Sequence, residues 1–295
     1  MRCPQKLPSA RLSVPGSITN IAGYRFVELH DRDALQAMFR SVCIDAGLKG
    51  TVLLAPEGIN FFLAGTADAI EVFVTFLNGD ERFSDIALKV SYTDYQPFNR
   101  MNVRKKNEII SVGLDHIRPA VFTGEEIEPG AFKRMLDKGT PVHVLDTRND
   151  YELRVGTFEN AIDLDIRTFR AFPKAIQALP ASMKDEPIVM FCTGGIRCEK
   201  ASAIMIEAGF TNVKQLKGGV LGYFEAVGGD HWQGDCFVFD QRVAVNPQLQ
   251  ETDAVVCFAC RQPLSVEEQA SEDYVVGVSC TYCIGREHVV PLSGQ

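Results

Sequence analysis

The chain has 295 residues, 46% of them hydrophobic and 23% charged, so it is large enough to bury more than one core and is expected to hold two or three domains. The net charge of −8 argues against a protein that coats nucleic acid over its whole surface, although one basic face is compatible with it. No run approaches the roughly 18 apolar residues of a membrane span, and the N-terminal residues lack the apolar centre of a signal peptide, so we expect a cytoplasmic protein with no membrane partner and nine reduced cysteines.

Residues 1–16 contain three prolines and no hydrophobic period, and we expect them to form a mobile tail. Residues 17–96 are expected to form the first domain. Their apolar spacing predicts strands at 24–29, 50–54, 61–64 and 87–92 and helices at 31–46 and 66–77. The resulting β-α-β-β-α-β order predicts a ferredoxin-like, or acylphosphatase-like, α+β domain.

Both helices of this domain have an apolar face. The face of the first is made of Leu35, Met38, Phe39, Val42 and Cys43. The second is expected to begin behind Thr66 as its cap. Between the two middle strands, the turn at 56–60 carries Glu57 and Asn60, which either face a ligand or complete a plain hairpin loop.

Residues 97–120 are predicted to be a basic linker. The first ten of them carry four positive charges and no acid, on Arg100, Arg104, Lys105 and Lys106. A short basic run is commonly a solvated face, and that alternative stays open. In an acidic protein, however, basic side chains near Phe98 offer phosphate neutralisation and an aromatic surface for an unstacked base, so the four are candidate RNA-binding residues.

Residues 121–245 are expected to form an α/β domain with a parallel sheet. Short apolar strands are predicted at 142–145, 161–166, 188–191 and 213–216, with helical segments between them. Ligands of such sheets bind beyond the carboxyl ends of the strands. Asp146 and Arg148 follow one strand end; they are either supporting site residues or a structural salt bridge, which is the favoured reading for Asp146. Arg167 and Arg170 are candidates for a second phosphate contact.

The loop of Cys192, Thr193, Gly194, Gly195, Ile196 and Arg197 follows another strand end and precedes a helical segment that closes at Gly209. Its glycines allow successive backbone N–H groups to turn toward one point, which makes an anion cradle. Arg197 adds a positive charge. Together these features are expected to lower the pKa of the Cys192 thiol and make it a nucleophile; the alternative is an ordinary strand-end cysteine before a Gly-Gly turn.

Cys198, six residues after Cys192, admits two interpretations. It is either a thiol that resolves an oxidised Cys192 by forming a disulfide, or a small buried helix residue, which is the favoured reading.

Residues 246–295 are predicted to be a small C-terminal segment with two cysteine knuckles. The four thiols, on Cys257, Cys260, Cys280 and Cys283, have the spacing of a tetrahedral zinc site. The alternative is two reduced pairs that merely pack. The spacer between the knuckles is acidic, so it is not expected to contact RNA.

Several of these segments resemble one family. The short six-residue loop that begins at Cys192, with Asp146–Arg148 and Glu152 upstream and Lys217–Gly219 downstream, resembles the rhodanese superfamily. Residues 192–202, 55–60 and 148–152 are similar to those of the bacterial rhodanese-like tRNA uridine hydroxylases, and the likeness extends from about residue 20 to 285. One departure is Gly156-Thr-Phe158, where many rhodanese relatives have Gly-His-Ile.

The resemblance implies a tRNA-modifying oxidoreductase that places oxygen on carbon 5 of the wobble uridine, with molecular oxygen as co-substrate, the tRNA anticodon arm as partner and no DNA. It also implies Cys192 as the catalytic residue. The sequence shows no flavin or nicotinamide motif, so the source of electrons stays open. The alternatives are a persulfide-forming sulfurtransferase and a non-enzymatic RNA-binding module; the intact loop argues against the last.

Overall fold

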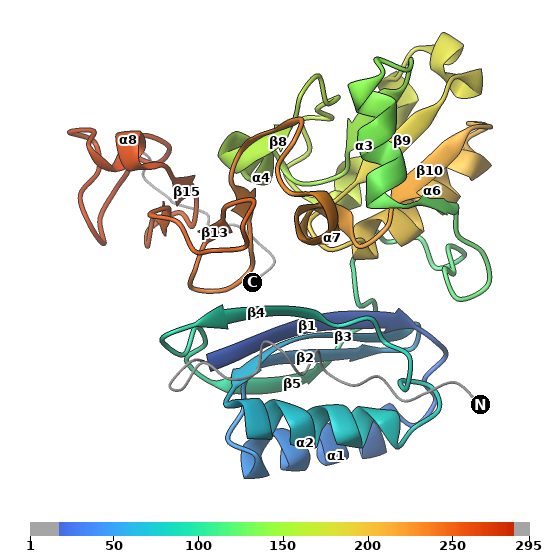
Figure 1. The fold of residues 1–295 in the computed structure, drawn as a ribbon. Helices are drawn as coiled ribbons and strands as arrows, with labels where there is room; N and C mark the ends of the chain where they lie inside the picture. The colour runs from blue at the N-terminus through green and yellow to red at the C-terminus, as the bar shows by residue number, and fades with distance from the viewer. Residues whose placement is uncertain (1–17, 286–295) are drawn as a thin grey trace. The chain divides into compact units, whose positions relative to one another are not determined.

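The structure, a computed structural model, describes residues 18–285 and divides into two compact units (Figure 1). The first comprises the described residues up to Ser111 together with Arg118–Phe122, and the second comprises Val112–Ile117 and the described chain from Thr123 onward. The predicted tail at 1–16 lies outside the described residues. In the part of the chain that is described, no helix is long and apolar enough to cross a bilayer.

The first unit is a five-stranded sheet covered on one face by two helices (Figure 1). Its elements are β1 Ile18–Phe26, α1 Arg32–Asp45, β2 Lys49–Ala55, β3 Gly58–Gly65, α2 Ala67–Asn78, β4 Lys89–Thr93 and β5 Met101–Lys105. The strand order is β4-β1-β3-β2-β5, with β5 parallel to β2 and the other neighbours antiparallel. The predicted ferredoxin-like domain is therefore confirmed, with one strand added.

The added strand β5 corrects the predicted linker at 97–120. Val103 is buried in the core of the first unit, and its carbonyl accepts a hydrogen bond from Gln36 Nε2 at 2.9 Å. The basic side chains that made this run look like a linker are those of an edge strand, where charged residues are common. Apolar Met101 and Val103 carry the strand signal at period two.

The helices of the first unit form largely as predicted. Thr66 Oγ1 accepts a hydrogen bond from the Ala69 N–H at 3.3 Å and so caps α2. On α1, Leu35, Phe39 and Cys43 are buried, whereas Met38 is half exposed and does not belong to the core face.

The second unit contains a four-stranded parallel sheet in the order β6-β10-β9-β7. Its elements up to Gly234 are β6 Glu125–Ile127, α3 Pro129–Asp137, β7 His143–Asp146, α4 Asp150–Val155, β8 Gly156–Phe158, 3-10 turns at Phe169–Ala171, Ile176–Ala178 and Ala181–Asp185, α5 Phe172–Ala175, β9 Ile188–Phe191, α6 Ile196–Glu207, β10 Val213–Leu216, α7 Gly219–Val227 and β11 Trp232–Gly234. This confirms the parallel-sheet α/β domain. The predicted strand at 161–166 is wrong, because only Ile162 bridges to Leu145 and Asp165 turns the chain with a φ of 49°.

The C-terminal segment belongs to the same compact unit as the parallel sheet. It contains β14 Val255–Val256, β15 Pro263–Leu264 and α8 Val266–Gln269, and it follows the short strands β12 Cys236–Phe237 and β13 Ala244–Val245. Tyr151 of α4 packs with Phe237 and Val243 in a small buried cluster, and Val256 lies at its edge. This cluster joins α4 to the chain that carries the cysteine knuckles.

Candidate active site and metal centre

The Cys192 loop connects the buried strand β9 to helix α6. Gly195 takes a φ of 100° and α6 begins one residue later, so the chain turns from β9 into α6 within the four residues 192–195. The N-terminus of α7 holds it from the other side, since the N–H of Val220 donates to the Cys192 carbonyl at 2.9 Å and that of Leu221 to the Thr193 carbonyl at 3.1 Å.

Gly219 is required by this arrangement. A β carbon there would lie 2.4 Å from the Cys192 carbonyl oxygen, and the φ of Gly219 is 64°. In the sequence, Gly219 is recognisable only as part of a family likeness; in the structure, its missing side chain lets α7 approach the loop.

The Cys192 sulfur sits in the predicted cradle. It accepts a hydrogen bond from the Gly195 N–H at 3.1 Å, and the N–H groups of Arg197 and Cys198 lie near enough to favour its anionic form. Burial by itself raises the pKa of this fully buried thiol. The hydrogen bond from the Cys198 thiol, the Arg197 charge and the backbone N–H groups outweigh burial and lower the pKa of Cys192 to about 5.

Cys198 is the protonated partner of this thiolate. It is fully buried on the first turn of α6, and its sulfur lies 3.7 Å from Thr147 Oγ1, which in turn donates to the Phe191 carbonyl at 2.9 Å. Burial and the neighbouring Cys192 sulfur raise the pKa of Cys198 well above its ordinary value. The structure thus places this thiol at the end of β9, beside the loop, rather than simply against the sheet.

Arg197 forms a buried ion pair with Glu152. Its Nη1 lies 2.5 Å from Glu152 Oε2 and its Nη2 lies 2.8 Å from Oε1, while Thr193 Oγ1 donates to Glu152 at 3.0 Å. Burial alone would raise the pKa of Glu152, but the charge and hydrogen bonds of Arg197 lower it. Sequence reasoning did not assign Glu152 to the site. Its local signal was its place three residues after Asn149 at the start of α4, where Glu152 accepts the Asn149 N–H at 3.1 Å.

Asp146 and Arg148 form the structural salt bridge that was the favoured reading. Both side chains are fully buried, and Arg148 Nη2 lies 2.6 Å from Asp146 Oδ2 and 2.7 Å from the Gly156 carbonyl. The guanidinium also stacks on Phe191 and Trp232, 5.4 and 5.1 Å from their ring centroids. The pair ties β7 to β8 and supports the strand that ends in the loop.

The candidate RNA-binding side chains are exposed and fall in both units. In the first, Lys105 pairs with Asp33, whereas Arg100, Arg104 and Lys106 form no ion pair with any described residue. In the second, Arg167 lies 3.6 Å from Asp150, and Arg170 approaches the backbone at Gly113.

Glu57 and Asn60 form hydrogen bonds with the backbone of Ile109, which follows β5. Glu57 Oε1 accepts a hydrogen bond from the Ile109 N–H at 2.8 Å, and Asn60 Nδ2 donates to the Ile109 carbonyl at 3.4 Å. Both side chains therefore stabilise the local backbone, which favours a plain hairpin loop over a turn that faces a ligand.

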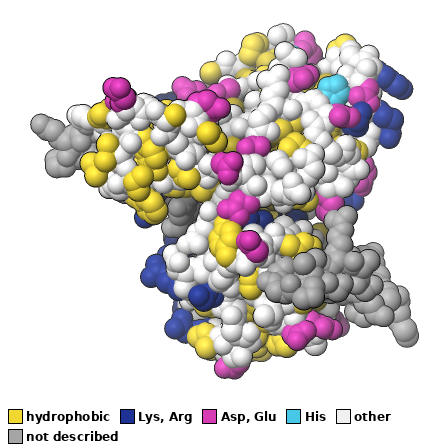
Figure 2. Space-filling view, turned by 60° about the vertical axis from the view of Figure 1, so that its left-hand side comes forward, with side chains coloured by type: hydrophobic (Ala, Val, Ile, Leu, Met, Phe, Trp, Pro, Cys, Tyr) yellow, Lys and Arg dark blue, Asp and Glu magenta, His cyan; other side chains and the backbone are white. Residues whose placement is uncertain are grey.

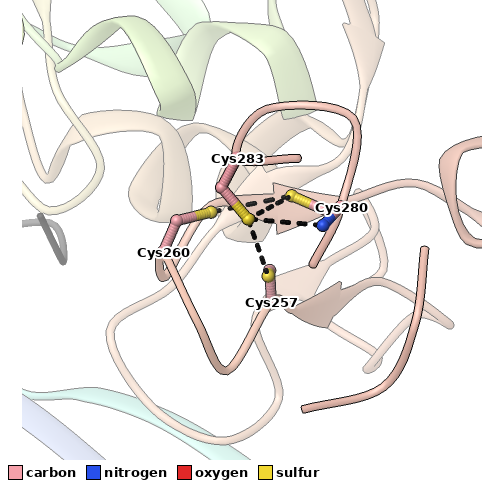
Figure 3. Close-up of side chains that lie close together, drawn as sticks. All are labelled: Cys257, Cys260, Cys280 and Cys283. Carbon is pink, nitrogen blue, oxygen red and sulfur yellow. Dashed lines mark hydrogen bonds between the residues drawn. The ribbon is translucent and has the colours of Figure 1, made fainter. Parts of the chain in front are cut away.

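The four C-terminal cysteines face one another (Figure 3). Sulfur separations are 3.9 Å for Cys257 and Cys283, 3.6 Å for Cys260 and Cys280, and 3.8 Å for Cys280 and Cys283, and all four sulfurs lie within 4.8 Å of one another. A zinc ion with Zn–S bonds of about 2.3 Å needs sulfurs about 3.8 Å apart at the corners of a tetrahedron. The donor set therefore fits a tetrahedral metal ion, and the spacing is too wide for disulfides.

The segment around these thiols has little apolar core to hold it. Its buried cluster consists of the four cysteines and Leu264, while six large apolar side chains are exposed: Phe258, Val266, Val275, Val276, Val278 and Ile284. Figure 2 shows hydrophobic side chains gathered on the surface of this segment. Burial of apolar area is thus a weak source of stability here, and a bound metal is the expected substitute.

Comparisons with known proteins cover both units. The UPF0176 acylphosphatase-like domain family matches residues 18–109 and the rhodanese-like domain family matches residues 128–226. Three curated relatives are named tRNA uridine(34) hydroxylase. Those of Cupriavidus taiwanensis and Cupriavidus necator are each 52% identical to this chain, over 273 and 275 residues, and that of Ralstonia nicotianae is 49% identical over 275 residues. The alignments cover 91%, 92% and 92% of this chain and 97%, 98% and 98% of the relatives.

We expect Cys192 to react as a thiolate far below the pH at which an ordinary cysteine does. Because its pKa is lowered, the thiolate persists as pH falls and is lost only near pH 5. Iodoacetamide reaches the buried Cys192 sulfur when the loop opens, so equal long incubations are compared across pH. Alkylation, read by peptide mass spectrometry from pH 4 to 9, should show a midpoint well below 7 for Cys192. Buried Cys236, whose pKa is raised to about 12, is the internal control and should stay unmodified across this range. A midpoint near 8.5 for Cys192 would contradict the cradle.

Proposed function

The chain belongs to the family of tRNA uridine(34) hydroxylases, and we propose that it hydroxylates carbon 5 of the wobble uridine of tRNA with Cys192 as the reacting group. The observation that supports this proposal most is the buried thiolate cradle of Cys192 in the rhodanese-like domain. Molecular oxygen is the proposed co-substrate and the anticodon arm the proposed partner. With tRNA as the substrate, the proposed location is the cytoplasm.

The protein's task at this site is to keep one sulfur anionic. Backbone N–H groups and the Cys198 thiol point at the Cys192 sulfur before any substrate binds, so no reorganisation is needed when the thiolate reacts. The sulfur has no exposed surface, and contact with a uracil ring therefore requires the loop to open or the sulfur to carry an added atom.

Cys198 has a place in the electron balance of this reaction. Hydroxylation with dioxygen consumes two electrons and two protons: the C5–H bond becomes C5–O–H, the O–O bond breaks, and the second oxygen leaves as water. Two thiols that become one disulfide release two electrons and two protons. We propose that Cys192 and Cys198 supply them, forming one S–S bond per turnover that an external thiol then reduces.

A sulfurtransferase is the second candidate. The short loop with its N–H groups suits a persulfide on Cys192 as well as a thiolate. A sulfurtransferase activity, however, gives no role to the first unit and its basic edge strand. We therefore place it second.

Cys192→Ser should abolish hydroxylation while leaving tRNA affinity nearly unchanged. The serine hydroxyl has a pKa far above that of the thiol, so the cradle no longer holds an anion at neutral pH. Purified protein with unmodified tRNA, under air and under nitrogen, is assayed by nucleoside mass spectrometry, with Cys236→Ala as the matched buried-cysteine control. Efficient thiocyanate formation from thiosulfate and cyanide, with unchanged RNA even in supplemented lysate, would favour the sulfurtransferase.

The same assay tests the two-thiol proposal through Cys198→Ser. Serine keeps a hydroxyl donor toward Cys192 but cannot form a disulfide, so multiple turnovers should be lost while the alkylation midpoint of Cys192 stays low. A stopped wild-type reaction should contain the Cys192–Cys198 disulfide. Wild-type turnover by the serine variant would refute the role.

Phosphate contact is proposed for Arg100, Arg104, Lys105 and Lys106, with Arg167 and Arg170 as a second group. Neutralising Arg100, Arg104 or Lys106 to Gln should reduce the slope of log affinity against log salt by about 0.7 to 0.9. Lys105→Gln should change it less, because Asp33 already compensates that charge. Exposed Lys138 on the second unit provides a control variant. An unchanged slope in all of these variants would show that the basic residues at 100–106 form a solvated face that does not contact RNA.

Zinc is the proposed occupant of the four-cysteine site, in a structural role. Elemental analysis of protein purified without chelator should find about one zinc per chain. Cys257→Ser should lose the metal and loosen the C-terminal segment before the parallel sheet unfolds. Less than about 0.2 zinc per chain, with no other metal in its place, would leave the four thiols as a packed cluster.

A further inference from the structure

Helix α4 lies between the active-site loop and the C-terminal segment. Toward the loop it presents Glu152, which holds both Arg197 and Thr193. Toward the C-terminal segment it presents Tyr151 and Arg154. A helix of six residues is marginal by itself, so its position depends on what covers it.

Arg154 contacts Gln262, which follows the first cysteine knuckle by two residues, and Tyr282, which lies within the second. Its guanidinium donates to Gln262 Oε1 and stacks on the Tyr282 ring at 4.4 Å from the centroid. The Gln262 carbonyl in turn accepts the Cys257 N–H at 2.9 Å, and Tyr282 stands between Cys280 and Cys283. Gln262 and Tyr282 can therefore both contact Arg154 when the two knuckles lie together.

An aromatic layer makes a second connection. Tyr151 packs edge-on against Phe237 at 5.4 Å between centroids, and Phe237 packs against Phe239 at 5.1 Å. Phe239 lies under the Arg197 guanidinium, 5.8 Å from it. Val256, the residue before Cys257, lies against the same cluster, so the layer runs from the first knuckle to the arginine of the loop.

We propose that the metal-bound cysteine knuckles act through Arg154 as a positioning element for the Cys192 loop. The metal fixes the two knuckles, the knuckles fix Arg154 and α4, and α4 holds Glu152 so that Arg197 stays where its charge favours the Cys192 thiolate. This inference rests on the proposed metal site and on Cys192 as the reacting group. It makes Arg154 a positioning residue, since it touches neither the reacting sulfur nor a substrate.

The experiment uses full-length protein without tRNA, so that its result is independent of the hydroxylase assay. Arg154→Ala should keep its metal by elemental analysis, yet amides 150–155 should exchange hydrogen about tenfold faster. The alkylation midpoint of Cys192 should rise by about one pH unit, because Arg197 is no longer held in place. Metal-free Cys257→Ser should show the same two changes, and Arg154→Lys, which keeps a cation near Tyr282, should show smaller ones.

Arg134→Ala is the matched control, since Arg134 is an exposed arginine on α3 of the same unit, and it should match the wild type in both measurements. Wild-type exchange and midpoint in both Arg154→Ala and Cys257→Ser would overturn the positioning role while leaving the metal site and the hydroxylase proposal intact. Wild-type protein that is metal-free as purified but already protected in α4 would overturn the metal's part in it.

Discussion

The buried ion pair of Arg197 and Glu152 is the contact on which the site depends. It joins the start of α6 to the first turn of α4. Removing two charges from water is costly, and the pair compensates by saturating its hydrogen bonds: Glu152 also accepts from Thr193 and from the Asn149 N–H. Losing one partner of such a pair typically costs about 3–5 kcal/mol, so the loop geometry and the fold of this region are not separable.

This pairing also explains how a thiolate can be buried. Glu152 binds both nitrogen ends of the guanidinium, so the Arg197 charge that favours the Cys192 thiolate is itself paired inside the protein, and the sulfur is held directly by neutral donors: the N–H groups of the loop and the Cys198 thiol. Fixed dipoles of this kind stabilise an anion without adding another buried charge that needs its own partner. The loop thereby reaches a low thiol pKa at a position where burial alone would raise it.

Local patterns in the sequence predicted most of the fold. Strands 188–191 and 213–216, the Thr66 cap and the apolar face of α1 apart from Met38 have period, cap or turn signals within a few residues, and they form as predicted. The errors occurred where a distant segment decides the structure. Strand β5 exists because β2 offers a free edge, and residues 161–166 fail to form a strand because only Ile162 finds a partner.

In the candidate site, too, features set by local sequence could be predicted and features set by distant segments could not. The cradle around Cys192 could be predicted from the sequence, since a strand end, two glycines and a helix start are consecutive in the chain. The ion pair could not be predicted, because Glu152 and Arg197 are 45 residues apart and the sequence offers each of them several oppositely charged residues as partners. The role of Gly219 could not be predicted either, because a β carbon there would meet the Cys192 carbonyl oxygen at 2.4 Å, and that oxygen lies 27 residues earlier in the chain.

The two cysteine sets of the second unit differ in what surrounds the sulfur, and the difference matters for the proposed chemistry. Cys192 is a single thiolate with N–H donors and one protonated neighbour, which suits a sulfur that is oxidised and reduced again. The C-terminal set places four sulfurs in mutual contact, where deprotonation of all four requires a cation to offset the repulsion. A thiolate bound to zinc is withdrawn from free exchange with disulfides, so metal binding would keep these four thiols from competing with Cys198 for an oxidised Cys192 in the same unit. On this argument a metal bound there would have a chemical role beside its structural one. Through the stacking of Arg154 on Tyr282, its binding would also support the Cys192 loop, as proposed above.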